Sequence, residues 1–77
     1  MSPRAIPPLP ARRVIKALQK LGFEIAGQRG SHVKLRHDDG RMVVVPDHGG
    51  RDLRFGTLMK IITEDAELTV DEFKDAL

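Results

Sequence analysis

Hydrophobic residues near the start of the chain recur with the period of an α-helix. In the segment 11–21, Val14, Leu18 and Leu21 stand three or four residues apart, and most positions between them are charged or polar. Gly22 follows, and glycine is the residue type that most often ends a helix. The pattern predicts an amphipathic helix over 11–21 whose apolar face covers a core.

Three shorter runs then carry the period-two alternation and the β-branched residues of strands. They span residues 23–28, 32–37 and 42–45. The turn signals between them are Gly30-Ser31 and Asp38-Asp39-Gly40, since glycine supplies the positive φ that a tight hairpin needs. Together they predict an antiparallel meander of three strands.

Helical periodicity returns after a glycine-containing loop over 47–52. A second helix is expected to begin between residues 53 and 56, and a capping-box sequence from Thr69 to Glu72 marks a third. The apolar residues expected on the buried faces of these helices are Leu58, Ile61, Ile62, Val70, Phe73 and Leu77. All three phenylalanines are assigned to the core: Phe23, Phe55 and Phe73.

This element order predicts a small single α+β domain, α-β-β-β-α(-α), with a three-stranded antiparallel sheet and helices on one face only. The other face is left open to solvent or to a ligand. Residues 1–10 contain four prolines and are expected to form an extended Pro-rich arm, in which Ile6 and Leu9 can lie against the domain of residues 11–77.

Composition places the chain among small globular domains. It has 77 residues, of which 40% are hydrophobic and 31% charged, and no cysteine, which excludes disulfides and thiolate metal sites. No apolar run approaches the roughly 18 residues that span a membrane, and the first residues lack the apolar segment of a secretory signal. We therefore expect a cytoplasmic protein with no membrane contact.

The net charge is only +2, but it is unevenly distributed. Residues 1–54 carry 11 Lys or Arg against 5 Asp or Glu, whereas residues 55–77 carry 2 against 6. The excess of positive charge in residues 1–54 favours a polyanionic partner for that part of the chain. The simpler explanation of the uneven charge is two ordinary solvated faces.

The segment from Arg29 to Arg36 places a histidine among cations directly after the Gly30-Ser31 turn. Side chains two residues apart in a strand point to the same face, so His32, Lys34 and Arg36 would share one side of the sheet. The apolar residues between them then face the core. An imidazole beside positive charge on an open sheet face is suited to binding and cleaving a phosphodiester.

RNA cleaves itself when its 2′-hydroxyl loses a proton and its 5′-oxygen leaving group gains one, and an imidazole can do either near neutral pH. His32 is therefore the candidate acid/base, with a plain solvated strand histidine as the simpler alternative. Cations nearby would stabilise the charge that develops on phosphorus. The candidate RNA-binding residues are Arg29, Gly30, Ser31, Lys34 and Arg36.

Other chemistries fit less well. His32 and His37 fall on opposite faces of a regular strand and cannot share an ion, and no ligand spacing supports a site that adds His48. Ser31 adjoins His32 in sequence, which directs the two side chains apart and disfavours a nucleophilic serine. No metal or cofactor is expected.

Two further functions stay open on the same sheet. The face has no aromatic platform for stacked bases, so RNA contacts would involve mainly phosphate and sugar, as in a non-catalytic RNA-binding module. A protein-binding domain whose open face pairs with another chain is the third possibility.

Six short segments carry a family resemblance when they are taken in order and at their spacings. They are Val14–Leu18, Leu21–Phe23, Gln28–His32, Val45–His48, Gly56–Leu58 and Ile61-Ile62. The set resembles the HicA-type toxins, which are small ribonucleases (mRNA interferases) of bacterial toxin–antitoxin systems. The resemblance covers the chain from about Leu9 to Leu77.

The resemblance implies a fold similar to a double-stranded-RNA-binding domain and metal-independent cleavage of mRNA. It implies that His32, in the Gly-Ser-His motif, is the catalytic histidine and that His48 has a structural or supporting role. It also implies a HicB-type antitoxin that binds the chain and masks His32. Contact with DNA is not expected from this chain alone.

Overall fold

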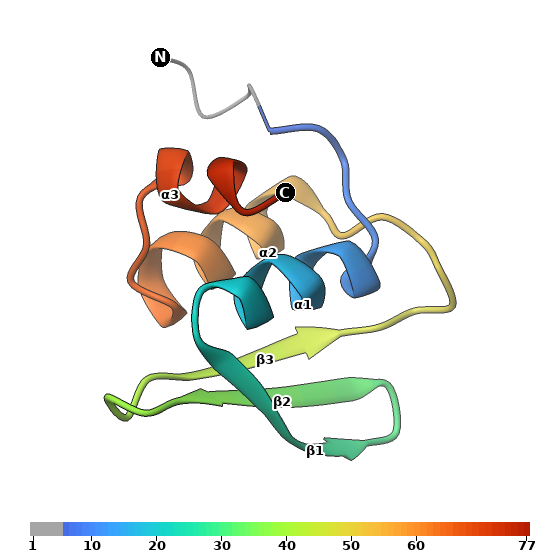
Figure 1. The fold of residues 1–77 in the computed structure, drawn as a ribbon. Coiled ribbons are helices and arrows are strands. Elements are labelled where there is room, and N and C mark those ends of the chain that lie inside the picture. The colour runs from blue at the N-terminus through green and yellow to red at the C-terminus, as the bar shows by residue number, and fades with distance from the viewer. Residues whose placement is uncertain (1–5) are drawn as a thin grey trace.

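The computed structural model describes residues 6–77, which form a sheet and a layer of helices (Figure 1). The elements are α1 (Ala11–Lys20), β1 (Phe23–Arg29), β2 (His32–His37), β3 (Met42–Pro46), α2 (Phe55–Lys60), the π-helical turn η2 (Ile61–Asp65) and α3 (Val70–Asp75). This order confirms the predicted α+β fold, and each element begins and ends close to its expected bounds.

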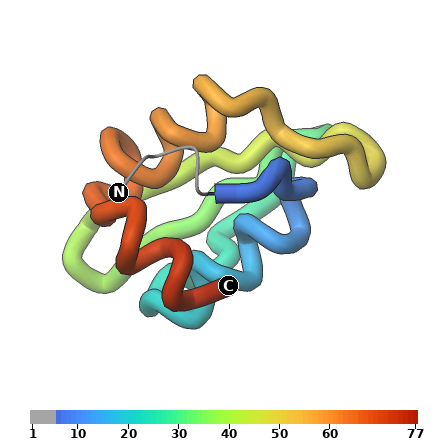
Figure 2. Tube along the Cα trace, turned by 90° about the horizontal axis from the view of Figure 1, so that it is seen from above, coloured from blue at the N-terminus to red at the C-terminus, as the bar shows by residue number. Residues whose placement is uncertain are grey.

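The sheet has the order β1-β2-β3, and both strand pairs are antiparallel. The helices lie over one face of it, and a view from above looks down on them with the strands beneath (Figure 2). The prediction of a meander covered on one side only is therefore confirmed. The uncovered side is called the open face below.

Helix α1 ends where the sequence predicts. Its buried residues include Val14 and Leu18, and Leu21 packs against the same core. Gly22 has a φ of +97°, a conformation that strains any residue with a Cβ atom. The chain can therefore turn sharply from α1 into the first residue of β1, Phe23, which is buried.

Residues 6–10, the described part of the predicted arm, pack against the domain. Ile6 and Leu9 are buried, and the Leu9 carbonyl accepts the Leu53 N–H at 2.8 Å. Pro10 pairs with Asp52 in an isolated antiparallel bridge. This segment ties the start of α1 to the segment before α2. The rest of the predicted arm, residues 1–5, lies outside the described residues.

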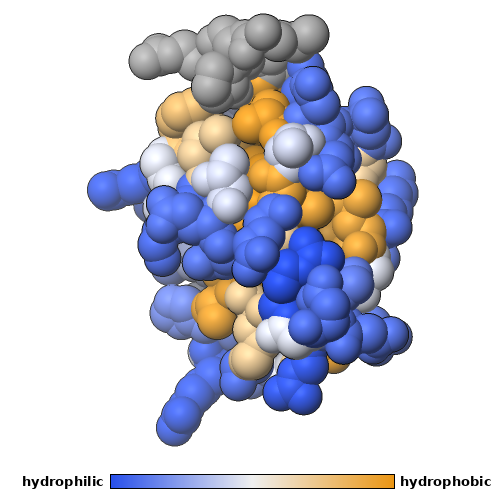
Figure 3. Space-filling model, turned by 90° about the vertical axis from the view of Figure 1, so that its left-hand side faces the viewer, coloured by the Kyte–Doolittle hydropathy of each residue, from blue (hydrophilic) through white to orange (hydrophobic). Residues whose placement is uncertain are grey.

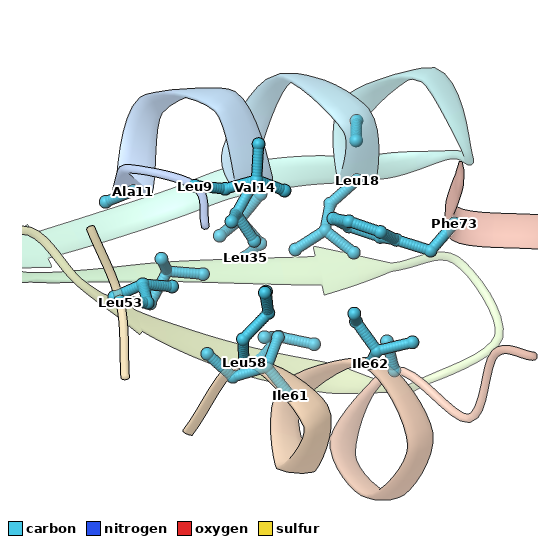
Figure 4. Close-up of a cluster of buried hydrophobic side chains, with 14 of the residues drawn as sticks. Leu9, Ala11, Val14, Leu18, Leu35, Leu53, Leu58, Ile61, Ile62 and Phe73 are labelled. Carbon is cyan, nitrogen blue, oxygen red and sulfur yellow. The ribbon is translucent and has the colours of Figure 1, made fainter. Parts of the chain in front are cut away.

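The core lies between the sheet and the helices, with α1 on one side and α2 and η2 on the other (Figure 4). Leu35, at the middle of β2, is 0% exposed, and Phe73 reaches the same cluster from α3. Full burial of a Leu or Phe side chain stabilises a fold by roughly 1.5–3 kcal/mol. These contacts hold β2 in place and so set the position of the open face.

The assignment of Phe55 to the core is wrong, although Phe23 and Phe73 are buried as expected. Phe55 is 45% exposed. It is the first residue of α2, where it lines a small hollow with Pro7 and Pro8 instead of entering the central cluster. The core positions of this helical stretch are taken by Leu58, Ile61 and Ile62, as predicted.

Arg41 links the β2–β3 hairpin to the helical layer. Its Nε atom lies 2.8 Å from an Asp39 carboxylate oxygen, its guanidinium donates to the Ala66 carbonyl, and it stands 5.1 Å from the centroid of the Phe23 ring. The side-chain hydrogen bond from Arg41 lowers the pKa of Asp39. Figure 3 views this end of the molecule, where hydrophilic side chains cover most of the surface.

Helix α3 opens with the predicted capping box. The Thr69 hydroxyl accepts the Glu72 N–H at 3.0 Å, and the Glu72 carboxylate accepts the Thr69 N–H at 2.8 Å. The backbone hydrogen bond from Thr69 lowers the pKa of Glu72. The cap orients a short helix whose main anchor in the core is Phe73.

Candidate nucleic-acid interface

The open face carries His32, Lys34 and Arg36, all exposed along β2. The residues between them are buried: Val33 is 4% exposed and Leu35 is 0% exposed. The prediction that these three polar side chains share one face is confirmed. The alternation follows from a strand covered by helices on one side and open on the other.

Cross-strand pairing brings one further predicted residue to His32. Arg29 pairs with His32 as the last pair before the β1–β2 turn. On the other side, His32 pairs with Pro46 at the end of β3. Directly paired residues point to the same face, so the imidazole is flanked by a cation on one strand and by a proline on the other.

An irregularity in β1 opens a hollow beside these residues. The register shifts between Ile25 and Gly27, which leaves Ala26 as an extra residue in the strand. The hollow has a volume of about 310 Å3 and is lined by Ala26, Gly27, Gln28, Arg29, His32, Lys34 and Val44. We call it the histidine hollow. It gathers Arg29, His32 and Lys34 in one place.

The remaining predicted site residues lie outside the lining of this hollow. Arg36 pairs with Glu24 on β1 and with Met42 on β3, farther along the open face. Gly30 has a φ of +58°, and its carbonyl accepts a hydrogen bond from Gln28 Nε2 at 3.2 Å. The Ser31 carbonyl accepts the Asp47 N–H at 2.6 Å. Gly30 and Ser31 thus shape the turn next to His32.

The sequence interpretation missed Gln28 and the Ala26-Gly27 irregularity. Gln28 both lines the histidine hollow and braces the turn through Gly30. A glycine inside a strand pattern is the available signal for Gly27, because such glycines often mark bulges. No comparable signal identifies Gln28.

In the described part of the chain, no carboxylate neutralises the cations of the histidine hollow. In residues 6–77, the Asp39 carboxylate pairs with Arg41 and the Asp65 carboxylate pairs with Lys60. In the same part of the chain, neither Arg29 nor Lys34 has a carboxylate within 4.0 Å. Their charge is therefore available to an anionic ligand at the open face.

The other two histidines lie elsewhere. The His37 ring stands edge-on to Phe23 at a centroid distance of 5.1 Å, and its Nδ1 accepts the Asp39 N–H at 3.1 Å. His48 lies in the loop after β3 and lines a second hollow with Arg51 and Arg54. Across residues 6–77, no three His, Asp or Glu side chains gather closely enough to share a metal ion.

Fold and site together define a small α+β domain that presents a histidine and two neighbouring cations, Arg29 and Lys34, on an uncovered sheet face. Residues 11–68 match the family model described as the HicA toxin of bacterial toxin–antitoxin systems. The chain therefore belongs to the HicA toxin family, which confirms the resemblance read from the sequence. A search of curated proteins returned no match.

Membership of this family makes the chain the toxin of a toxin–antitoxin system, and such a system implies an antitoxin as partner. In the part of the chain that the structure describes, no helix is long and apolar enough to cross a membrane.

Proposed function

We propose that the chain is a metal-independent RNA endonuclease that cleaves mRNA with His32 as acid/base and is neutralised by a HicB-type antitoxin. The observation that carries the proposal is the histidine hollow, where Arg29, His32 and Lys34 converge beside an uncovered sheet. Membership of the HicA toxin family supports it, because the sequence resemblance to that family implies a ribonuclease.

In the proposed reaction, the His32 imidazole takes the proton of an RNA 2′-hydroxyl, and the 2′-oxygen attacks the adjacent phosphorus. The bond from phosphorus to the 5′-oxygen then breaks, and that oxygen gains a proton from the imidazolium or from water. The products are a 2′,3′-cyclic phosphate and a 5′-hydroxyl. No oxidant, metal or cofactor enters this balance.

Arg29 and Lys34 take the role of stabilising the phosphorane-like charge, since both line the hollow that holds the imidazole. Gly30 and Ser31 position His32 by shaping the turn that precedes it. Arg36 would contact the RNA farther along the strand. With one imidazole for both proton transfers, turnover is expected to be slow compared with a two-histidine ribonuclease.

The open face also supports the antitoxin part of the proposal. Met42 and Val44 are 40% and 44% exposed there, and Val44 lines the histidine hollow. Exposed apolar side chains of this kind favour a protein partner more than they favour RNA. A HicB-type antitoxin covering them would mask His32 and compete directly with RNA. We place the reaction in the cytoplasm, where mRNA and the antitoxin are both made.

The proposal is tested with a single-stranded RNA and with the same sequence carrying a 2′-deoxy sugar at the cleaved position. Cleavage of the first in the presence of EDTA, and no cleavage of the second at the modified position, is the expected result. Loss of cleavage on chelation would point to metal catalysis and contradict the proposal. Cleavage at the 2′-deoxy position would exclude the 2′-hydroxyl as nucleophile.

A further inference from the structure

The loop between β3 and α2 is anchored to the domain at both ends. At its start, the Asp47 N–H donates to the Ser31 carbonyl at 2.6 Å. At its end, Asp52 pairs with Pro10 and the Leu53 N–H donates to the Leu9 carbonyl at 2.8 Å. Figure 1 shows this loop in yellow at the same end of the sheet as the turn between β1 and β2. The loop therefore occupies a defined position beside the turn that precedes His32.

Within the loop, a tight turn brings a histidine and an arginine together. The Arg51 N–H donates to the His48 carbonyl at 3.3 Å, and both central residues of this turn have positive φ, +64° at Gly49 and +86° at Gly50. Two positive φ values define the type I′ turn, in which the first and fourth Cα atoms lie within about 7 Å of each other. The paired glycines thus place His48 close to Arg51.

These residues line a second hollow, with a volume of about 500 Å3. Its lining is Pro46, His48, Arg51, Asp52, Leu53, Arg54 and Thr57. Arg51 and Arg54 are exposed, and neither pairs with a carboxylate within 4.0 Å in the described part of the chain. Asp52 is the single acidic side chain of the lining. We call this the loop hollow.

The two hollows are neighbours. His32 lines the histidine hollow, Pro46 lines the loop hollow, and these two residues are cross-strand partners. The Cα atoms of paired residues in antiparallel strands are about 5 Å apart. A chain of nucleotides passing over His32 toward the edge of the sheet would therefore reach the loop hollow next.

We propose that the loop hollow is a second RNA subsite, in which Arg51 and Arg54 bind the phosphates that flank the cleaved phosphodiester, with His48 beside them. This inference rests on the proposed function, since it assumes that RNA crosses the open face at His32. Arginines without carboxylate partners are suited to phosphate contacts, which position a strand without reading its sequence. The cationic lining favours RNA over an apolar protein segment.

The test uses a His32→Ala background, so that RNA remains intact while its binding is measured at several salt concentrations. The double variant Arg51→Gln/Arg54→Gln is compared with Arg51→Lys/Arg54→Lys, which keeps both charges. A matched control, Lys16→Gln/Lys20→Gln, removes two exposed cations from α1 that, in the described residues, have no carboxylate within 4.0 Å. The probes are single-stranded RNAs of about four and about twelve nucleotides, within the range of known single-strand site sizes.

Each phosphate contact on a single strand contributes about 0.7 to the slope of log K against log salt concentration. For the longer RNA, the Gln pair is expected to reduce that slope by about 1.4 relative to its background. The Lys pair and the control pair are expected to retain it. For the shorter RNA, which fills the histidine hollow alone, all slopes should agree.

An unchanged slope for the Gln pair, with a background protein that does bind RNA, would overturn the second subsite and leave the loop hollow to a protein partner. An equal reduction by the control pair would overturn it as well, because the effect would then reflect total charge. A background protein that binds no RNA at low salt would instead overturn the proposed function, and this inference with it.

Discussion

Arg29 is the cross-strand partner of His32, and both residues line the same hollow on the open face. The pair is the last one before the β1–β2 turn, so the backbone holds the cation and the imidazole side by side. Lys34 reaches the hollow from the next outward-facing position of β2. Arg29 and Lys34 therefore differ from the other surface cations discussed here in that they line the same hollow as His32.

The first prediction concerns these two cations. Arg29→Gln and Lys34→Gln are each expected to lower the rate of RNA cleavage by about 100-fold, because each removes a charge facing the reacting phosphate. Arg36→Gln should cost much less, since Arg36 lies beside Glu24 and outside the hollow. Initial rates on one single-stranded RNA measure all three. Equal losses for the three variants would show that general surface charge is responsible.

Gly22 provides a prediction about stability. A Cβ atom at Gly22 would lie 2.7 Å from His37 Nε2, and the φ of +97° is itself unfavourable for alanine. We expect Gly22→Ala to lower the free energy of unfolding by about 1–3 kcal/mol. Gly56→Ala is the control. Gly56 lies in helix α2, and a Cβ atom added to it would meet nothing within 4 Å.

Replacement of glycine by alanine inside a helix is expected to stabilise by about 0.5–1 kcal/mol. Denaturant unfolding should therefore show that Gly22→Ala lowers the free energy of unfolding and that Gly56→Ala raises it. A Gly22→Ala variant as stable as the natural chain would contradict the close approach of the His37 ring.

Asp39 provides a pH dependence. Its pKa is lowered in the folded chain, chiefly by the side-chain hydrogen bond from Arg41, so the ionised carboxylate stabilises the fold above its unfolded pKa. This contribution is lost as the pH falls through the folded pKa. We expect Asp39→Asn to be less stable than the natural chain at neutral pH and equally stable in strong acid.

Thermal unfolding across the acid range measures this difference. Asp38→Asn is the control, because Asp38 lies in the same turn and forms no ion pair within 4.0 Å in the described residues. A constant difference between Asp39→Asn and the natural chain at every pH would argue against the ion pair with Arg41.

The capping box predicts a cost at the start of α3. Thr69→Ala removes the acceptor for the Glu72 N–H and is expected to destabilise the fold by about 1 kcal/mol. Thr63→Ala is the comparison, because the Thr63 hydroxyl of η2 donates to the Met59 carbonyl one turn earlier in α2 and caps no helix. Similar unfolding midpoints for the two variants would show that the cap contributes little.

Much of the fold could be predicted because local signals and burial agree. The alternation along β2 predicts which side chains face outward, and Gly22 and the Thr69–Glu72 pair mark helix ends by their own chemistry. Phe55 shows the limit of this approach. Its exposure depends on where α2 begins relative to Pro7 and Pro8, which no local pattern encodes.

The site was predictable to a similar extent. Strand periodicity places His32, Lys34 and Arg36 on one face. The strand register decides that Arg29 lines the histidine hollow with His32 and Lys34, and that Arg36 lies outside it. The loop hollow depends on hydrogen bonds between segments distant in sequence, from Asp47 to Ser31 and from Leu53 to Leu9. Such contacts form only in the folded chain.

The most direct measurement compares the natural chain with His32→Ala and with His37→Gln for cleavage of one long single-stranded RNA. His32 is exposed on the open face, whereas His37 lies on the other side of the sheet against Phe23. Thermal unfolding checks that both variants are folded. We predict that His32→Ala loses at least about 100-fold in rate while His37→Gln retains cleavage. Equal cleavage by His32→Ala and the natural chain would remove His32 from the reaction and contradict the proposed mechanism.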